Sequence, residues 1–339
     1  MPTPLRCDPK LFTKDLTGQV IIVTGANSGI GLETSRQLVK QGARVILACR
    51  NHERGEAAVK DAGGEFLTTL DLSSLACVKA FVDTFLSKYD RLDVLVNNAG
   101  VMACPYAKTQ DDFEVQFGSN HLGHFYLMRL LTPILLKTAE TTGKPSRFIS
   151  LSSSMASAMN GLLVGRLPHA NIQFDNLMWE NTKYDEVRAY QQSKLANYLH
   201  AMEAAKRYRA NQLISVAVHP GWVQTNLDVH RFRKSLGDGF IGKAIAKFIR
   251  SIFRWKGDLI HVVDGSQTTL YCVLEDADKM ESGAFYSQIG QYQDPELCPG
   301  GWPYKKSINL EHATPENADK LWKISNKLVG FVDQSEDPI

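Results

Sequence analysis

Residues 20–31 read Val-Ile-Ile-Val-Thr-Gly-Ala-Asn-Ser-Gly-Ile-Gly, an apolar, β-branched run that leads into three glycines. The run predicts a buried strand, and the glycines predict a tight turn into a following helix. Such a turn exposes backbone N–H groups at a helix N-terminus, where a phosphate group can bind. The spacing Gly-x-x-x-Gly-x-Gly differs from the more common Gly-x-Gly-x-x-Gly, but its position between strand and helix still predicts a dinucleotide-binding loop.

Further apolar runs follow along the chain, at 44–48, 65–70, 92–96, 147–151, 213–218 and 284–287. Helix-like segments lie between them, near 73–88, 110–138, 187–210 and 264–275. Continuous apolar strands that alternate with amphipathic helices are typical of a parallel sheet covered on both faces. The sequence therefore predicts the α/β class, with a single Rossmann-type, doubly wound parallel sheet of about seven strands.

One domain is expected at 17–330, with an N-terminal extension at 1–16 and a C-terminal tail at 331–339. Two segments, 154–186 and 226–263, are too long for simple connections between a strand and a helix. Long insertions after strands of such a sheet lie over the ligand crevice. We expect both to contribute to a substrate pocket.

Composition excludes several classes of protein. A net charge of +2 over 339 residues gives no general attraction for nucleic acid. The six cysteines are scattered without zinc-site spacing, so we expect reduced thiols and no metal site.

The N-terminus lacks the apolar core of a signal peptide, and no apolar run reaches the length of a membrane span. A cytoplasmic location is expected, with peripheral contact to a membrane surface left open.

A second motif, Tyr190-Gln191-Gln192-Ser193-Lys194, places a phenol and an ammonium four residues apart, on one face of a helix. A nearby positive charge favours the phenolate, so the pair can make tyrosine an acid or base. Alone the motif is weak, because such pairs occur by chance in many helices. The motif becomes significant because other candidate site residues accompany it. These are Ser152-Ser153 after the run 147–151, Asn120, and the segment 219–225.

Four short stretches carry a family likeness: Ala-Cys-Arg at 48–50, Asn-His-Leu-Gly-His-Phe at 120–125, Ser-Lys-Leu-Ala-Asn at 193–197 and His-Pro-Gly at 219–221. With the glycine loop and Tyr190, they resemble the short-chain dehydrogenases/reductases over residues 17–330. Within that superfamily the chain is similar to the retinol-dehydrogenase-like and WW-domain-oxidoreductase-like branch.

The resemblance implies a catalytic set of Asn120, Ser153, Tyr190 and Lys194. Tyr190 would be the general acid/base, and Lys194 would activate it and bind the nicotinamide ribose. Ser153 would hold the substrate oxygen, with Ser152 as the neighbouring alternative. Asn120 would position Lys194 through its backbone and a water molecule.

The cofactor prediction depends on Arg50. The residues after the run 44–48 include no acid of the kind that bonds the ribose 2′-hydroxyl of NAD. Arg50 can bind a 2′-phosphate, which a carboxylate would repel. We therefore expect NADP(H). The alternative is that Arg50 is a solvated loop residue without a role in binding. The expected cofactor contacts are Thr24, Gly25, Asn27, Ser28, Gly29, Ile30, Gly31, Arg50, Asp71, Leu72, Asn98, Ala99, Gly100, Tyr190, Lys194, Pro220, Gly221, Val223 and Thr225.

The expected function is NADP(H)-dependent oxidoreduction between a carbonyl and an alcohol on an apolar small molecule, such as a retinoid, a steroid or a lipid. The alternatives are an NADPH-binding regulatory protein with little turnover and a reductase of an activated C=C bond. Residues 239–255 form a basic amphipathic pattern that fits a lid, a membrane contact or core packing. By analogy with the family, a homo-oligomer would pair through the helices near 110–138 and 187–210.

Overall fold

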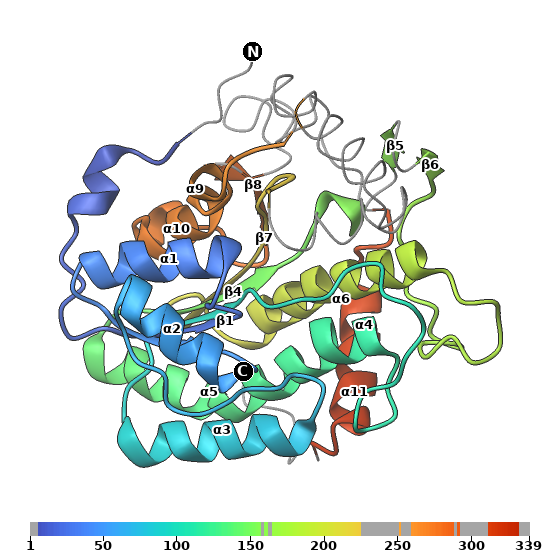
Figure 1. Ribbon diagram of the computed structural model, residues 1–339, viewed down its shortest axis with the longest axis horizontal. Helices are drawn as coiled ribbons and strands as arrows, with labels where there is room; N and C mark the ends of the chain where they lie inside the picture. Colours follow the sequence, from blue (N-terminus) through green and yellow to red (C-terminus); the bar gives the residue numbers. More distant parts are fainter. Residues whose placement is uncertain are drawn as a thin grey trace.

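The computed structural model describes residues 6–156, 159–161, 165–224, 251, 259–287, 290–291 and 311–331. Its main sheet has the strand order β2-β1-β3-β4-β7-β8-β9, with most of its strands visible in Figure 1. The first six are parallel, and β9 pairs antiparallel with β8. The strand bounds are β1 (Val20–Thr24), β2 (Arg44–Ala48), β3 (Val94–Asn97), β4 (Ser146–Leu151), β7 (Leu213–His219), β8 (Phe285–Ser287) and β9 (Gly290–Gln291). The predicted α/β fold with a doubly wound parallel sheet is confirmed.

Helices cover both faces of this sheet. They are α1 (Gly29–Lys40), α2 (His52–Ala62), α3 (Leu75–Lys88), α4 (Val115–Phe117), α5 (Gly123–Thr142), α6 (Glu186–Arg207), α9 (Val262–Gly265), α10 (Gln267–Leu274) and α11 (Pro315–Leu328). A π-helical turn, η2 (Gly118–Leu122), joins α4 to α5. Short 3-10 turns are η1 (Pro9–Thr13), η3 (Ser154–Ala156) and η4 (Ala277–Lys279), and β5 (Met159–Gly161) pairs with β6 (Gly165–Leu167) in a separate hairpin.

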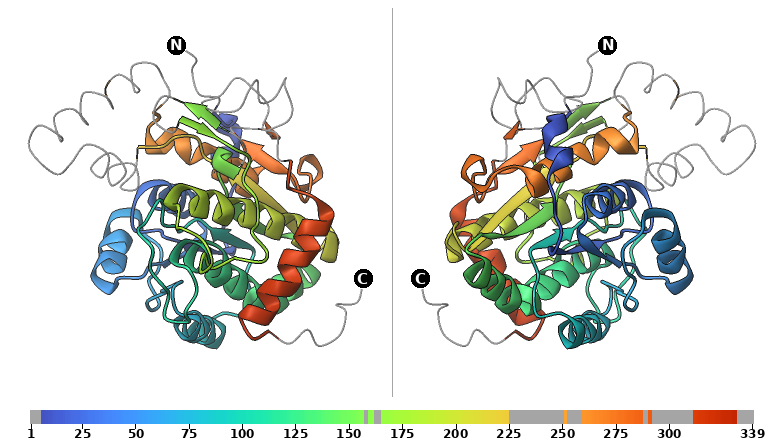
Figure 2. Two further views of the ribbon diagram at one scale, coloured as in Figure 1. Left: turned by 90° about the vertical axis from the view of Figure 1, so that its right-hand side faces the viewer. Right: turned by 90° about the vertical axis from the view of Figure 1, so that its left-hand side faces the viewer.

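Alternation along each strand divides the core into two layers. In β1, Ile21 and Val23 pack on the side of α1, α2 and α10, whereas Val20 and Ile22 pack on the side of α3, α5 and α6. This follows from the two-residue period of a strand, which sends successive side chains to opposite faces. Figures 1 and 2 show the resulting helix layers on either side of the strands.

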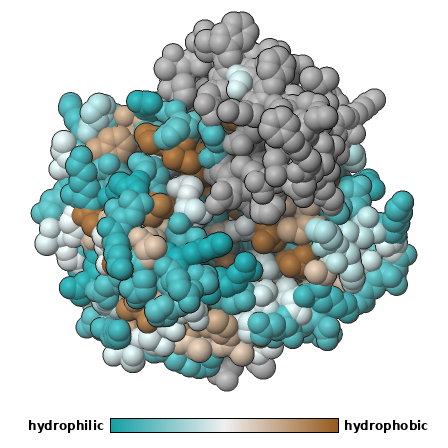
Figure 3. All heavy atoms as spheres, viewed as in Figure 1, coloured by the Kyte–Doolittle hydropathy of each residue, from teal (hydrophilic) through white to brown (hydrophobic). Residues whose placement is uncertain are grey.

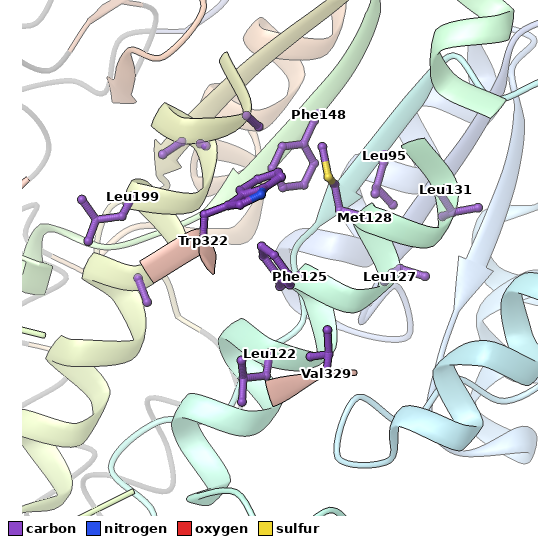
Figure 4. Packing of buried hydrophobic residues seen from close by; sticks show 14 of the residues in the cluster. Leu95, Leu122, Phe125, Leu127, Met128, Leu131, Phe148, Leu199, Trp322 and Val329 are labelled. Atoms are coloured by element: carbon purple, nitrogen blue, oxygen red, sulfur yellow. The ribbon is translucent and has the colours of Figure 1, made fainter. Parts of the chain in front are cut away.

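The C-terminal helix α11 belongs to the second layer. Its Trp322 is fully buried, and its ring lies edge-on to Phe125 of α5 with the centroids 5.0 Å apart (Figure 4). The helix also packs along α6. It therefore closes the apolar face that α5 and α6 turn away from the sheet.

One expected strand is absent: residues 65–70 form only a single bridge, between Glu65 and Ile46 of β2. The Leu70 N–H then donates to the Cys49 carbonyl at 2.9 Å, so the segment still runs beside β2. Between these points the Phe66 ring turns toward α2, where a Cβ on Gly55 would lie 2.4 Å from it. Packing against α2 therefore replaces the strand pairing that the apolar composition predicted.

The N-terminal residues 6–16 pack against the domain. Cys7, Leu11 and Leu16 are buried in the layer of α1 and α10. The Gln41 side chain donates to the Leu11 carbonyl at 2.8 Å. This part of the expected extension thus contributes to the core.

The described surface is mainly polar. Leu86 and Tyr106 are the exposed large apolar side chains among the described residues. In the face that Figure 3 shows, hydrophilic side chains surround small, separate apolar groups. Within the described ranges, no helix is long and apolar enough to cross a bilayer.

Candidate active site

The candidate site lies at the carboxyl edge of the parallel sheet. β1 is flanked by β2 on one side and by β3 on the other, so the chain leaves β1 in one direction and returns on the opposite side. In sheets of this kind, ligands bind at such a switch point, outside the carboxyl ends of the strands. The glycine loop after β1 lies at this position.

Crowding explains the glycines of the loop. Gly25 and Gly29 have φ angles of +65° and +58°, in the left-handed region that favours glycine. A Cβ on Gly31 would lie 2.4 Å from Asn98 Nδ2 and 2.6 Å from the Gly25 oxygen. Asn27 and Ser28 complete the turn, and Ser28 is the N-cap of α1 with an extended backbone. The resulting bare backbone at a helix N-terminus fits the phosphates of a dinucleotide.

Thr24 joins the ends of β1 and β3. Its hydroxyl accepts hydrogen bonds from the backbone N–H groups of Asn98 and Ala99, both at 2.9 Å. The Asn98 side chain donates in return to the Thr24 carbonyl at 2.7 Å. These bonds fix the loop after β3 against the glycine loop.

The residues expected around the adenosine half of the cofactor lie at the same edge. Arg50 is exposed, two residues beyond the end of β2. The Asp71 carboxylate accepts from the backbone N–H of Ser73 at 2.9 Å and from its hydroxyl at 2.7 Å. A Cβ on Gly123 would lie 2.3 Å from the Leu72 oxygen, so glycine at 123 allows α5 to approach this segment.

Tyr190 and Lys194 lie on α6, which begins at the N-cap Asp185. The Lys194 Nζ is 5.7 Å from the centroid of the Tyr190 ring, and it donates a hydrogen bond to the Leu151 carbonyl at 3.0 Å. Both side chains are buried. Burial disfavours the ammonium and lowers the pKa of Lys194 to about 8.

Asn120 lies in the π-helical turn η2 and binds to two other segments. Its Oδ1 accepts from the Val101 N–H at 2.8 Å, and its Nδ2 donates to Ser193 Oγ at 2.9 Å. The Ser193 hydroxyl donates in turn to the Tyr190 carbonyl at 2.8 Å. A Cβ on Gly100 would lie 3.2 Å from Asn120 Oδ1 and 3.5 Å from Lys194 Nζ. The structure thus brings Gly100, Asn120 and Lys194 together.

The two alternative serines have different surroundings. Ser152 is buried, and its hydroxyl donates to the Lys194 carbonyl at 2.6 Å. Ser153 is half-buried, and its Oγ accepts from the Met155 N–H at 3.2 Å. Within the described ranges the Ser153 hydroxyl proton has no protein acceptor, whereas that of Ser152 bonds to the backbone of α6.

The segment after β7 reaches the glycine loop. Pro220 is half-buried, and Gly221 turns the chain with φ of +88°. Val223 forms a parallel bridge with Ile260 and packs with Ile30 of α1. Thr225 lies outside the described residues, as do residues 226–250 and 252–258, which hold most of one expected insertion and of the amphipathic pattern at 239–255.

The insertion expected at 154–186 contributes to the core. Leu177 and Trp179 are 8% and 5% exposed and are buried with the core, and Phe174 and Met178 pack against the layer of α3, α5 and α6. These residues are packing groups rather than an open apolar wall. The apolar residues 162–164 of the same insertion lie outside the described residues.

Two residues without an expected role, Ser193 and His124, contact the candidate set. His124 bonds to Thr24 and Asn120, and Ser193 bonds to Asn120 and Tyr190. Both residues belong to the quoted stretches, and His124 follows Asn120 by one helical turn, which was an available signal. No group of metal-binding side chains was found in the described part of the chain.

Comparison with known proteins supports the assignment to a family. Residues 19–162 match the family model of the short chain dehydrogenases. Human retinol dehydrogenase 13 is 42% identical over 324 residues, which cover 93% of this chain and 86% of that protein. Mouse retinol dehydrogenase 11 is 37% identical over 327 residues, which cover 93% of this chain and 88% of that protein.

A solved structure has the same fold. The crystal structure of 3-ketoacyl-(acyl-carrier-protein) reductase from Brucella melitensis, complexed with NADH, matches with a TM-score of 0.59. The match covers 80% of this chain and 96% of that chain, at 22% identity. On the family model and the retinol dehydrogenase relatives, this chain belongs to the short-chain dehydrogenases/reductases, in their retinol-dehydrogenase-like branch.

Proposed function

We propose that this oxidoreductase uses NADP(H) to interconvert a carbonyl and an alcohol on an apolar small molecule, with Tyr190 as the general acid/base. The observation that carries the proposal is the buried pair of Tyr190 and Lys194, with the Lys194 Nζ 5.7 Å from the phenol ring. The pair lies beside Gly100, which belongs to the loop that Thr24 fixes to the glycine loop. The proposed acid/base group and the proposed dinucleotide loop would thus act at the same edge of the sheet.

A bound nicotinamide would supply or accept the hydride. The chain's own residues would handle the proton and the substrate oxygen. Tyr190 would donate its phenolic proton to the oxygen during reduction and take it back during oxidation. The Lys194 ammonium would favour the phenolate, and the Ser153 hydroxyl would donate a hydrogen bond to the oxygen as negative charge develops on it.

The preference for NADP(H) rests on Arg50. Short-chain dehydrogenases bind a nicotinamide cofactor, but the Brucella reductase was crystallised with NADH, and its likeness to this chain concerns only the fold. Arg50 is exposed at the end of β2, where a 2′-phosphate would lie, and no acid stands between residues 48 and 51. A guanidinium binds phosphate bidentately and at low desolvation cost.

The apolar substrate class rests on the relatives, which are named for retinol. The test is an NADPH-consumption screen with aldehydes and ketones of graded size, retinal among them. Turnover that rises with the apolar size of the carbonyl would support the proposal. If the protein binds NADPH and turns over no carbonyl, a regulatory role without catalysis replaces it.

A further inference from the structure

We propose that His124 is a positioning residue of the active site, which links Thr24 beside the glycine loop to Asn120 beside Tyr190 and Lys194. This inference rests on the proposed function, because it concerns how the catalytic groups are held. His124 is 2% exposed at the start of α5. Its Nε2 lies 2.9 Å from Thr24 Oγ1, and its Nδ1 lies 3.0 Å from the Asn120 carbonyl oxygen.

The surroundings of Thr24 fix the direction of the first hydrogen bond. A threonine hydroxyl has one proton and two lone pairs. Both lone pairs are used, because the oxygen accepts from the N–H groups of Asn98 and Ala99. Its proton must therefore go to His124 Nε2, which carries no proton itself.

The Asn120 contact fixes the second hydrogen bond independently. A carbonyl oxygen can only accept, so Nδ1 of His124 must carry a proton and donate it. Both contacts thus select the neutral tautomer with the proton on Nδ1. Burial lowers the pKa of His124 to about 4, which keeps the ring neutral at physiological pH.

The link extends into the catalytic set on both sides. Asn120 holds the loop after β3 through Val101 and holds α6 through Ser193, whose hydroxyl bonds to the Tyr190 carbonyl. Thr24 holds the same loop from its other end, at Asn98 and Ala99. His124 therefore sets the distance between the glycine loop and the π-helical turn that presents Asn120. Small displacements at such a site are costly, since a shift of about 1 Å can slow catalysis by a factor on the order of 100.

His121 offers a matched control. It belongs to the same stretch, is 1% exposed, and has its Nε2 2.8 Å from Ser325 Oγ on α11. Its ring packs against Phe117, Phe125 and His200. His121→Phe therefore removes an imidazole that is as deeply buried as that of His124, and it leaves the hydrogen bonds of His124 to Thr24 and Asn120 in place.

The first experiment measures the tautomer directly in the wild-type protein. Nitrogen-15 NMR of histidine-labelled protein distinguishes a protonated from an unprotonated ring nitrogen, and His124→Phe identifies the resonance. We expect a protonated Nδ1 and an unprotonated Nε2 at pH 7. A proton on Nε2 would overturn the inference without reference to any activity.

The second experiment tests positioning with NADPH and retinal, or with the best carbonyl from the screen. His124→Phe should lower kcat about tenfold or more and change the KM for NADPH less than about threefold, because geometry rather than binding is lost. The double variant Thr24→Val/His124→Phe should be less severe than the product of the single effects, since each single variant already removes the bond between Thr24 Oγ1 and His124 Nε2. Thr24→Val alone also leaves the N–H groups of Asn98 and Ala99 without this acceptor. His121→Phe should lower stability while its kcat stays within about twofold of the wild type.

If the wild type is active and His124→Phe has the same kcat, the inference about His124 is overturned while the proposed function stands. Fully multiplicative effects of Thr24→Val and His124→Phe would also overturn it. A wild type that turns over no carbonyl would overturn the proposed function, and the positioning role with it.

Discussion

The Lys194 ammonium is buried and donates a hydrogen bond to the Leu151 backbone oxygen, 3.0 Å away. That oxygen also accepts from Asn197 Nδ2 at 2.8 Å. Burial of the charge is the cause that lowers the pKa of Lys194 to about 8. The protein therefore keeps beside Tyr190 a cation that destabilises its own folded state.

Replacing this lysine should separate stability from activity. Lys194→Met keeps the length of the side chain and removes the buried charge, and Asn197 still satisfies the Leu151 oxygen. We expect the free energy of unfolding of the cofactor-free variant to exceed that of the wild type by on the order of 2 kcal/mol. We also expect the variant to lose both turnover and cofactor affinity. Chemical denaturation, NADPH titration and kinetics measure the three effects.

The stability difference between Lys194→Met and the wild type should depend on pH. The folded-state pKa of about 8 lies below the ordinary value of 10.5, so the unfolded chain binds more protons between these values. The cost of burying Lys194 is thus complete below pH 8 and disappears as the pH rises toward 10.5. A difference that stays constant from pH 7 to pH 10 would contradict this explanation.

The neighbouring serines should respond differently to removal of a hydroxyl. Ser153→Ala should lower kcat by a factor on the order of 100, with little change in the melting temperature, because its proton is available to the substrate oxygen. Ser152→Ala should cost about 1 kcal/mol of stability, because its hydroxyl bonds to the α6 backbone. Thermal unfolding and kcat are measured side by side. The reverse assignment would follow if Ser152→Ala lost more turnover than Ser153→Ala.

Arg50 should discriminate between the two nicotinamide cofactors. Arg50→Ala should weaken NADPH binding about tenfold or more and leave NADH binding nearly unchanged, since only the 2′-phosphate contact is lost. Arg44→Ala is the control, because Arg44 is an exposed arginine at the opposite end of β2. Isothermal titration gives both affinities. Equal wild-type affinities for NADPH and NADH would exclude the proposed preference.

Much of the fold could be predicted from periodicity and glycine placement. The pattern at 20–31 specifies β1, its turn and α1, because an apolar run, an N-cap and a left-handed turn all indicate the same structure. Residues 65–70 mislead because pairing there depends on Phe66, whose contact with Gly55 on α2 is not visible in local sequence. Helix α11 was not among the expected helices, although Thr314-Pro315-Glu316 is a helix-start signal.

The catalytic candidates could be identified from motifs, but their connections could not. Tyr190 and Lys194 are four residues apart, so one helix brings them together. His124 and Thr24 are separated by 100 residues, and only the packing of α5 against the sheet brings them into contact. Hydrogen-bond directions, such as that of Ser152 toward α6, likewise require coordinates.

The central claim is that the Tyr190 hydroxyl is the proton donor. Tyr190→Phe removes one oxygen atom and keeps the ring and its packing, and Tyr198→Phe makes the same change two turns later on α6, where the ring packs against Phe285. The direct measurement is kcat for NADPH-dependent carbonyl reduction, with melting temperature and NADPH affinity determined in the same preparations. We predict that Tyr190→Phe folds, binds NADPH and loses kcat by a factor on the order of 100 or more, whereas Tyr198→Phe remains active. Near-normal kcat in Tyr190→Phe would contradict the account, because another group would then have to supply the proton.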